Sequence, residues 1–351
     1  MKKGGLAMVL AAGMAAGSPP NGAVAQPVQP LPRHTGPVAL DAPSVTIGNG
    51  VLTAKIYRVD ARKGFYRGTR FDQAGVVGSL TITNAKGAGH DFYGPWFDRV
   101  SDDVHDFMFT PDGIVGGPDS AISGPVEEFA PIGFDAAAAG GTFVKIGVGV
   151  LKKPDDAPYD HYRIYDIVDA GKRGFKSDKT SATFTQDIPG QYLYVKTLVL
   201  AGNQMRIEHE LTNRMAAPIA TTVYDHNFAK LSPGNADVAV TFPFAATANP
   251  APDPALAKMD GSRFTHTRAL KDAERVSTSF TGFGTGARDY DITAENVRTG
   301  AAVRVTADHL LVKVNYFSVR SIMAVEPYIA INLAPGQSMR WTYTYTYTAP
   351  R

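Results

Sequence analysis

The segment RWTYTYTYT at residues 340–348 constrains the fold more than any other stretch of the chain. Its residues alternate strictly, with Trp341, Tyr343, Tyr345 and Tyr347 in one register and threonines in the other. Successive side chains of a β-strand point to opposite faces, so this alternation predicts a strand with one aromatic face and one hydroxyl face. β-branched and aromatic residues also suit a pleated surface. The segment therefore predicts a half-buried β-strand.

Many other segments have the same character, and segments with helical periodicity are nearly absent. Strand-like runs that Gly, Pro, Asn and Asp punctuate occur at residues 52–59, 75–83, 142–151, 192–200, 205–211, 219–228, 238–244, 301–307, 310–319 and 322–333. Parallel sheets need crossover helices, which this sequence does not offer. We therefore expect an all-β fold, a large antiparallel β-sandwich formed by a single domain at residues 43–351.

The amino end has the pattern of a secretory signal peptide at residues 1–25. Two lysines precede a short apolar run, and Ala23-Val24-Ala25 fits a small-x-small cleavage site, with the cut after Ala25. The apolar run is shorter than the ~20 residues that span a bilayer, so no membrane span is expected. A proline-rich tether follows at residues 26–42. These features predict a periplasmic or secreted protein.

Composition excludes several kinds of chemistry. The chain has no cysteine, so it has neither a thiol nucleophile nor a thiolate metal site. It has 35 Lys and Arg against 33 Asp and Glu, a formal net charge of +2, which does not indicate a nucleic-acid partner. The sequence lacks a G-x-S-x-G elbow, a P-loop, a dinucleotide fingerprint and an H-E-x-x-H motif. We therefore expect no cofactor and no metal site.

The stretch VYDHNFAKL contains the first candidate catalytic residue, His226. By the two-residue repeat, Tyr224, His226 and Phe228 share one face near the exit of a strand, where scaffolds often present reactive groups. Two aromatic rings beside an imidazole would suit a sugar ring. A buried histidine that a backbone carbonyl satisfies is the other interpretation. By contrast, His209 alternates with Ile207 and Leu211, which predicts a structural role.

The second candidate is Glu326, which lies in the apolar segment SIMAVEPYIAINL. A carboxylate is costly to bury there unless it is paired, and desolvation would raise its pKa toward the range that suits a general base. The alternative is a salt bridge to Arg320 or Arg340.

Two segments carry a resemblance to a known family. TNRMAAPIATTVYDHNFAKL and AVEPYIAINLAPGQSMRWTYTY resemble segments of the aldose 1-epimerases (galactose mutarotases) and related hexose-phosphate epimerases. The resemblance covers residues 45–349, with matching spacing and order in the carboxyl-terminal half and only a general likeness in the amino-terminal half. It implies the galactose mutarotase-like supersandwich, a large β-sandwich fold.

The resemblance also implies roles for the candidate residues. His226 would protonate the ring oxygen of a sugar, and Glu326 would take the proton from the anomeric hydroxyl on the opposite side of the ring, with no cofactor. Tyr224, Asn227 and Phe228 around the histidine become substrate-binding candidates. The family has a second histidine earlier in the chain, and the candidates are His90, His105 and His161. Of these, His105 is the substrate-binding candidate, because Asp103 and Asp106 flank it and would raise its pKa.

The motif KGFYRGTRFD adds Arg67 and Arg70 as substrate-binding candidates. A guanidinium donates two parallel hydrogen bonds to a carboxylate or phosphate, so a pair of arginines would favour an acidic sugar. Internal pairing with Asp72, Glu127 or Glu128 is the alternative.

Three functions of different classes remain open. The first is an aldose 1-epimerase, a cofactor-independent isomerase that acts on a monosaccharide or oligosaccharide. The second is a polysaccharide or uronate lyase on the same fold, and the third is a non-catalytic carbohydrate-binding protein.

Overall fold

A computed structural model describes residues 42–94, 124–271 and 274–351. The predicted signal peptide, almost all of the predicted tether and His105 lie outside these ranges. The described residues belong to one compact unit, Arg33–Arg351.

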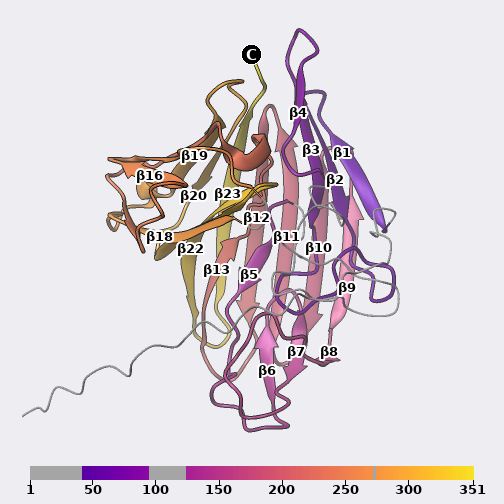
Figure 1. Cartoon of the computed structure of the whole chain (residues 1–351). Helices are drawn as coiled ribbons and strands as arrows, with labels where there is room; N and C mark the ends of the chain where they lie inside the picture. The colour runs from indigo at the N-terminus through magenta and orange to yellow at the C-terminus, as the bar shows by residue number, and fades with distance from the viewer. Residues whose placement is uncertain (1–41, 95–123, 272–273) are drawn as a thin grey trace, which may run out of the picture. The chain divides into compact units, whose positions relative to one another are not determined.

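The described residues form four sheets with antiparallel strand pairs (Figure 1). The ten-stranded sheet has the order β16 (Ala257–Asp260), β17 (Arg263–His266), β14 (Val238–Thr241), β19 (Asp291–Asn296), β20 (Ala302–Ala307), β23 (Ser338–Thr348), β12 (Gln204–Asn213), β11 (Tyr192–Ala201), β10 (Ser181–Ile188), β9 (Lys172–Ser177). The six-stranded sheet has the order β15 (Thr247–Asn249), β18 (Arg275–Thr281), β21 (Lys313–Val319), β22 (Met323–Leu333), β13 (Ile219–Asp225), β5 (Glu127–Phe129).

Two smaller sheets complete the described fold. One contains β1 (Ser44–Gly48), β2 (Leu52–Tyr57), β3 (Val77–Thr83) and β4 (Gly89–Asp91), and the other contains β6 (Thr142–Lys145), β7 (Gly149–Lys152) and β8 (Ile167–Asp169). The helical elements within the described ranges are two short 3-10 helices, η1 (Pro233–Asn235) and η2 (Ala287–Asp289). Over the same ranges, no helix is long and apolar enough to cross a bilayer. The expected all-β class is confirmed.

The aromatic segment forms β23, which lies between β12 and β20 inside the ten-stranded sheet (Figure 1). Trp341, Tyr343, Tyr345 and Tyr347 are all fully buried, while the threonines between them are partly exposed. The alternation in the sequence thus identified both the strand and its buried face.

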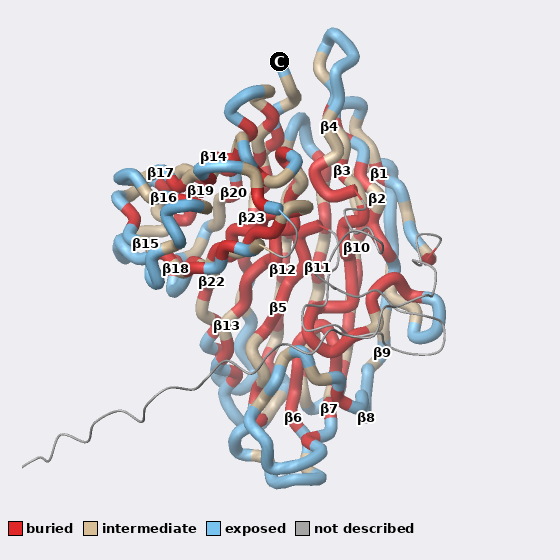
Figure 2. The backbone as a smooth tube through the Cα atoms, viewed as in Figure 1, coloured by how far each residue is buried: buried red, intermediate tan, exposed pale blue. Residues whose placement is uncertain are grey.

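The ten-stranded and six-stranded sheets pack face to face. The ring of Phe129, on β5, lies 5.6 Å from the ring of Tyr194 on β11 and 6.2 Å from that of Trp341 on β23. Between the same two sheets, the Tyr345 hydroxyl bonds the Asp225 carboxyl. Figure 2 shows β5 buried along its length, as a strand that packs against the large sheet should be. The fold is therefore a β-sandwich.

A buried cluster of charges lies between these sheets. The Lys196 amino group contacts carboxylate oxygens of Asp72, at 3.2 Å, and of Glu127. The Nε2 atom of His209 lies 2.7 Å from the other Glu127 oxygen. A charge removed from water is costly unless it is paired, and here each carboxylate has a cationic or N–H partner. His209 therefore has a structural role, as the sequence predicted.

Candidate active site

Strand register brings the two catalytic candidates together. In the pairing of β13 with β22, Tyr224 is opposite Tyr328. Two residues further on, Glu326 lies on β22 and His226 directly follows the end of β13, and His226 Nδ1 lies 3.2 Å from Glu326 Oε1. Because cross-strand neighbours on one face are about 5 Å apart at Cβ, side chains of this size must touch. Residues 100 positions apart in the sequence thus form one pair.

A cavity of about 500 Å³ lies over this face of the six-stranded sheet. Its volume is within the usual range of small-molecule sites. Both members of the pair line it, together with aromatic and hydroxyl side chains. Its ionisable lining residues other than tyrosines are Arg70, Glu128, His161, His226, Arg275, Lys313 and Glu326.

The Glu326 carboxyl has a pKa that lets it gain or lose a proton near neutral pH. Its side chain is only 6% exposed, and burial raises its pKa to about 7. The positive charge of Arg70 and a hydrogen bond with Asn315 act in the opposite direction, while the negative charge of Glu128 adds to the rise. The pKa rise expected from the apolar segment is confirmed. The alternative partner Arg340 instead pairs with Glu210.

His226 is held neutral. Burial lowers its pKa well below the usual value, and the nearby Arg70 charge lowers it further. Its ring stacks on Phe228 at 3.8 Å and is tilted toward Phe71 at 5.4 Å. The Nδ1 atom is within contact distance of Glu326 but makes no hydrogen bond of good geometry within the described part of the chain. A buried polar atom without a hydrogen bond is rare in proteins, so the described residues leave Nδ1 unsatisfied beside the Glu326 carboxyl.

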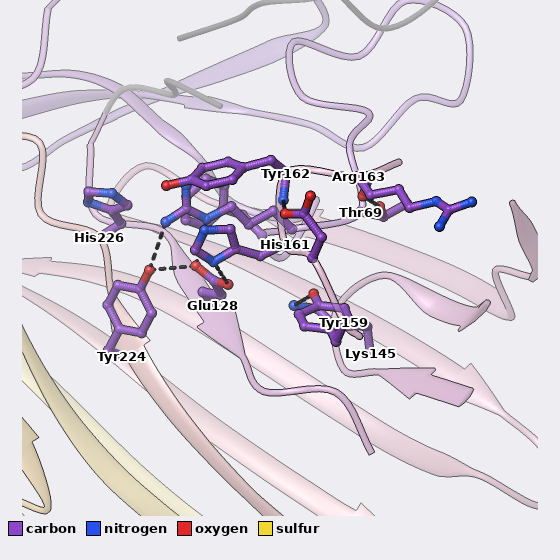
Figure 3. Close-up of polar contacts among 12 residues, drawn as sticks. Thr69, Glu128, Lys145, Tyr159, His161, Tyr162, Arg163, Tyr224 and His226 are labelled. Atoms are coloured by element: carbon purple, nitrogen blue, oxygen red, sulfur yellow. Dashed lines mark hydrogen bonds and ion pairs between the residues drawn. The ribbon is translucent and has the colours of Figure 1, made fainter. Parts of the chain in front are cut away.

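The side chains of Arg70, Glu128, Tyr224 and His161 form a hydrogen-bonded cluster beside the His226–Glu326 pair. Arg70 Nε donates to Glu128 Oε2 at 2.7 Å, and Arg70 Nη2 donates to the Tyr224 hydroxyl at 3.2 Å. Figure 3 shows Tyr224 and His161 both approaching the Glu128 carboxylate, with His161 Nδ1 at 3.4 Å. Burial opposes ionisation of Glu128, but Arg70 and His161 outweigh it and hold its pKa well below the usual value. The cluster fixes the Arg70 guanidinium at the cavity wall.

The other predicted substrate-binding residues that the structure describes do not line the cavity beside Arg70 and Tyr224. Arg67 Nη1 donates to the Arg62 carbonyl, and Arg67 does not line the cavity with Arg70. The Asn227 side chain turns to the interior, where it bonds the Val325 carbonyl and the Tyr345 hydroxyl. Phe228 is fully buried behind His226. His105 lies outside the described residues.

The arrangement of the pair differs from the one that the resemblance implied. A distance of 3.2 Å between His226 and Glu326 leaves no room for a sugar ring between them. Both groups therefore present themselves to a bound molecule from the same wall of the cavity.

Sequence reasoning missed several lining residues. The sequence predicts Glu128 only as an internal partner for the arginines, and it does not predict Lys313, Asn315 and Phe317 as site residues, although all four line the cavity. A signal for the last three existed in LLVKVNYFSV, where they occupy one face by the two-residue repeat. Nothing in the sequence shows that the strand with these three residues pairs with the strand of Glu326.

No protein-family model matches the sequence, and no curated protein matches it. Among solved structures, the chain is similar to a galactose mutarotase-like protein from Clostridium acetobutylicum, with 12% sequence identity, a TM-score of 0.51, and coverage of 87% of this chain and 95% of that one. It is also similar to a galactose mutarotase-like protein from Lactobacillus casei, with 13% identity, a TM-score of 0.50, and coverage of 87% and 100%. The chain therefore has the galactose mutarotase-like fold, as the resemblance implied.

Proposed function

We propose that the protein is an aldose 1-epimerase, which binds a sugar in the cavity and interconverts its anomers with His226 and Glu326 as the acid–base pair. The observation that carries the proposal is a buried carboxyl with a pKa of about 7 in contact with an imidazole nitrogen that lacks a hydrogen bond. A general acid or base works best when its pKa is near the working pH.

The pair carries about one proton near neutral pH, and that proton has two positions. In one tautomer Glu326 is protonated and His226 is neutral, which burial favours. In the other, Glu326 is a carboxylate and His226 an imidazolium. At 3.2 Å, a small rotation of either side chain aligns Nδ1 with Oε1 and lets the proton pass from one to the other.

The second tautomer is the reactive one. The Glu326 carboxylate takes the proton of the anomeric hydroxyl, the bond from C1 to the ring oxygen breaks, and the imidazolium gives its proton to the ring oxygen. The open-chain aldehyde then rotates about its C1–C2 bond and recloses with the proton transfers reversed. Ring opening leaves Glu326 protonated and His226 neutral, the tautomer that burial favours, so the surroundings stabilise the open-chain intermediate.

Other lining residues suit sugar binding. Tyr224 and Tyr328 stack with ring centroids 4.2 Å apart, and they place aromatic surface beside the pair. Asn315 donates to the Tyr328 hydroxyl at 3.1 Å and accepts from Ser279, which fixes its amide for a sugar hydroxyl.

A uronate lyase is the second candidate, because Arg275 and Lys313 add positive charge to the cavity. In that reaction the Glu326 carboxylate would remove the C5 proton beside the uronate carboxyl group, the glycosidic bond from C4 to oxygen would break to leave a C4–C5 double bond, and the His226 imidazolium would protonate the departing oxygen. The sequence pattern at residues 1–25 supports export to the periplasm or secretion. Amino-terminal sequencing of the protein after expression in a bacterium tests this, with Gln26 as the expected first residue.

Freshly dissolved α-anomers of neutral and acidic sugars test the main proposal. Proton NMR measures the rate of anomeric exchange, and ultraviolet absorbance detects an unsaturated uronide. We expect wild-type protein to accelerate exchange for at least one sugar, and Glu326→Gln and His226→Asn each to remove most of that acceleration. Glu210→Gln, a partly exposed carboxylate paired with Arg340 on the ten-stranded sheet, is the matched control. Wild-type exchange rates in both site variants would contradict the proposal, and uronide absorbance without exchange would favour the lyase.

A further inference from the structure

The cavity extends along β21 beyond the acid–base pair. Asn315 is opposite Glu326 in register, and Phe317 is the next residue on the same face. Both line the cavity. The space over the pair is therefore continuous with space over Phe317.

The Phe317 ring is accessible from that space. Its register neighbours are Ala324 on β22 and Ser277 on β18, and both have small side chains that leave the ring uncovered on either flank. The ring is partly exposed and stands edge-on to His226, with centroids 6.5 Å apart. An aromatic face beside hydroxyl groups is a surface on which the apolar face of a sugar can stack.

Arg275 lies at the far end of the same face. It is two residues beyond Ser277 on β18, it lines the cavity, and it is exposed. By comparison, Arg263 on β17, Arg268 just after β17 and Arg304 on β20 each pair with a carboxylate. Within the described ranges, Arg275 has no such partner among the ion pairs formed, although it is at the wall of a cavity.

The spacing along β18 gives the reach of this surface. Ser279 is in the row of Asn315 and Glu326, and Arg275 is four residues away on the same strand. At about 3.3 Å per residue, four residues correspond to ~13 Å. This backbone separation is longer than one pyranose ring, so a sugar at the pair leaves room for a further sugar unit before the Arg275 side chain.

We propose that the cavity binds an acidic oligosaccharide, with its reducing-end sugar at Glu326 and His226, the next sugar on Phe317, and a carboxylate or sulfate group of the chain at Arg275. The inference rests on the proposed carbohydrate function and specifies its substrate class. A guanidinium binds either anion with charge-assisted hydrogen bonds. The acid–base pair would thus act on the end of a charged chain.

Calorimetric titration with defined probes tests this subsite. The probes are galacturonic acid, trigalacturonate, trimannuronate, a sulfated galactose trisaccharide, and the neutral methyl ester of trigalacturonate. We expect at least one anionic trisaccharide to bind more tightly than galacturonic acid and than the methyl ester. The uronate and sulfate probes distinguish the two sources of negative charge.

Variants separate the parts of the subsite. We expect Arg275→Gln to weaken the binding of the preferred anionic trisaccharide by about tenfold or more, as loss of a charge-assisted hydrogen bond does, and to weaken galacturonic acid and the methyl ester much less. Phe317→Ala should weaken all trisaccharides. Arg263→Gln, a surface arginine outside the cavity, is the control and should bind like wild type.

Two outcomes would overturn the inference. One leaves the proposed epimerase function intact, and the other contradicts that function as well. If monosaccharide anomers exchange but trisaccharides bind no better than galacturonic acid, or if Arg275→Gln binds them like wild type, the subsite is wrong and the epimerase stands. If no probe binds and no sugar exchanges, the carbohydrate function fails as well.

Discussion

Glu326 and His226 touch across two neighbouring strands, with 3.2 Å between Oε1 and Nδ1, and neither has an arginine or lysine as a direct ion-pair partner within the described residues. The contact explains why the pair can hold one proton between them while both groups are buried. The charges of Arg70, Glu128 and Lys313 act on Glu326 only from further away. Single substitutions of these charged residues should therefore change the pKa of Glu326.

The rate of anomeric exchange should fall as pH rises through about pH 7. The reactive tautomer carries the one proton of the pair on His226, and the pair loses that proton as pH passes the Glu326 pKa of about 7, because burial also keeps the pKa of His226 low. A profile of kcat/KM between pH 5 and 9, from NMR exchange rates corrected for buffer catalysis, measures this. A rate that stays level or rises between pH 6 and 8 would show that the one-proton pair is not the reactive state.

Substitutions in the Arg70–Glu128 pair should move that limb in opposite directions. Arg70 lowers the pKa of Glu326 and Glu128 raises it. Arg70→Gln should therefore shift the falling limb of kcat/KM to higher pH, and Glu128→Gln should shift it to lower pH. Equal shifts of the same sign would contradict the electrostatic account.

Glu326→Gln should stabilise the folded protein at alkaline pH. The pKa of Glu326 is raised on folding from 4.5 to about 7, so its stability contribution is complete below about pH 4.5 and is lost as pH rises to about 7. The neutral amide removes that loss, a gain of about 3 kcal/mol above pH 7 at roughly 1.4 kcal/mol per pKa unit. Urea unfolding at pH 4 and pH 8 measures it. A gain of the same size at both pH values would point to a packing effect instead.

Lys196→Met should strongly destabilise the protein. It removes the cation that faces Asp72 and Glu127 in the buried cluster, and breaking such a cluster costs about 3–5 kcal/mol. Urea unfolding followed by circular dichroism measures the loss. Lys176→Met on the edge strand β9, an exposed lysine, is the matched control and should change stability little. If both variants unfold at the same urea concentration, the cluster does not stabilise the fold.

Local patterns in the sequence predicted the elements and their faces, but they did not predict which elements meet. The alternation around Trp341 identified a strand and its buried face, and the apolar setting of Glu326 predicted its raised pKa. The contact with His226 depends on the register of β13 against β22, which a period of two residues does not specify. The cavity depends in addition on loop residues such as His161.

The two arginines of KGFYRGTRFD also show that local sequence does not determine which side chains meet. Arg67 and Arg70 are three residues apart, and an extended or bent segment could have directed both to one ligand. Instead, Arg67 bonds the Arg62 carbonyl, while Arg70 turns to Glu128. Because Glu128 comes from β5, a long-range contact decides the direction of Arg70.

The position of β23 inside the ten-stranded sheet has a consequence for biogenesis. On one side it pairs with β12, which leads to β11, β10 and β9, and on the other with β20, which leads to β19 and β14. All of these strands leave the ribosome before β23 does. The two halves of the sheet can assemble as separate hairpins and meanders during translation, but they join only when the last aromatic strand inserts between them, so both inner edges stay open to aggregation or to chaperones until then.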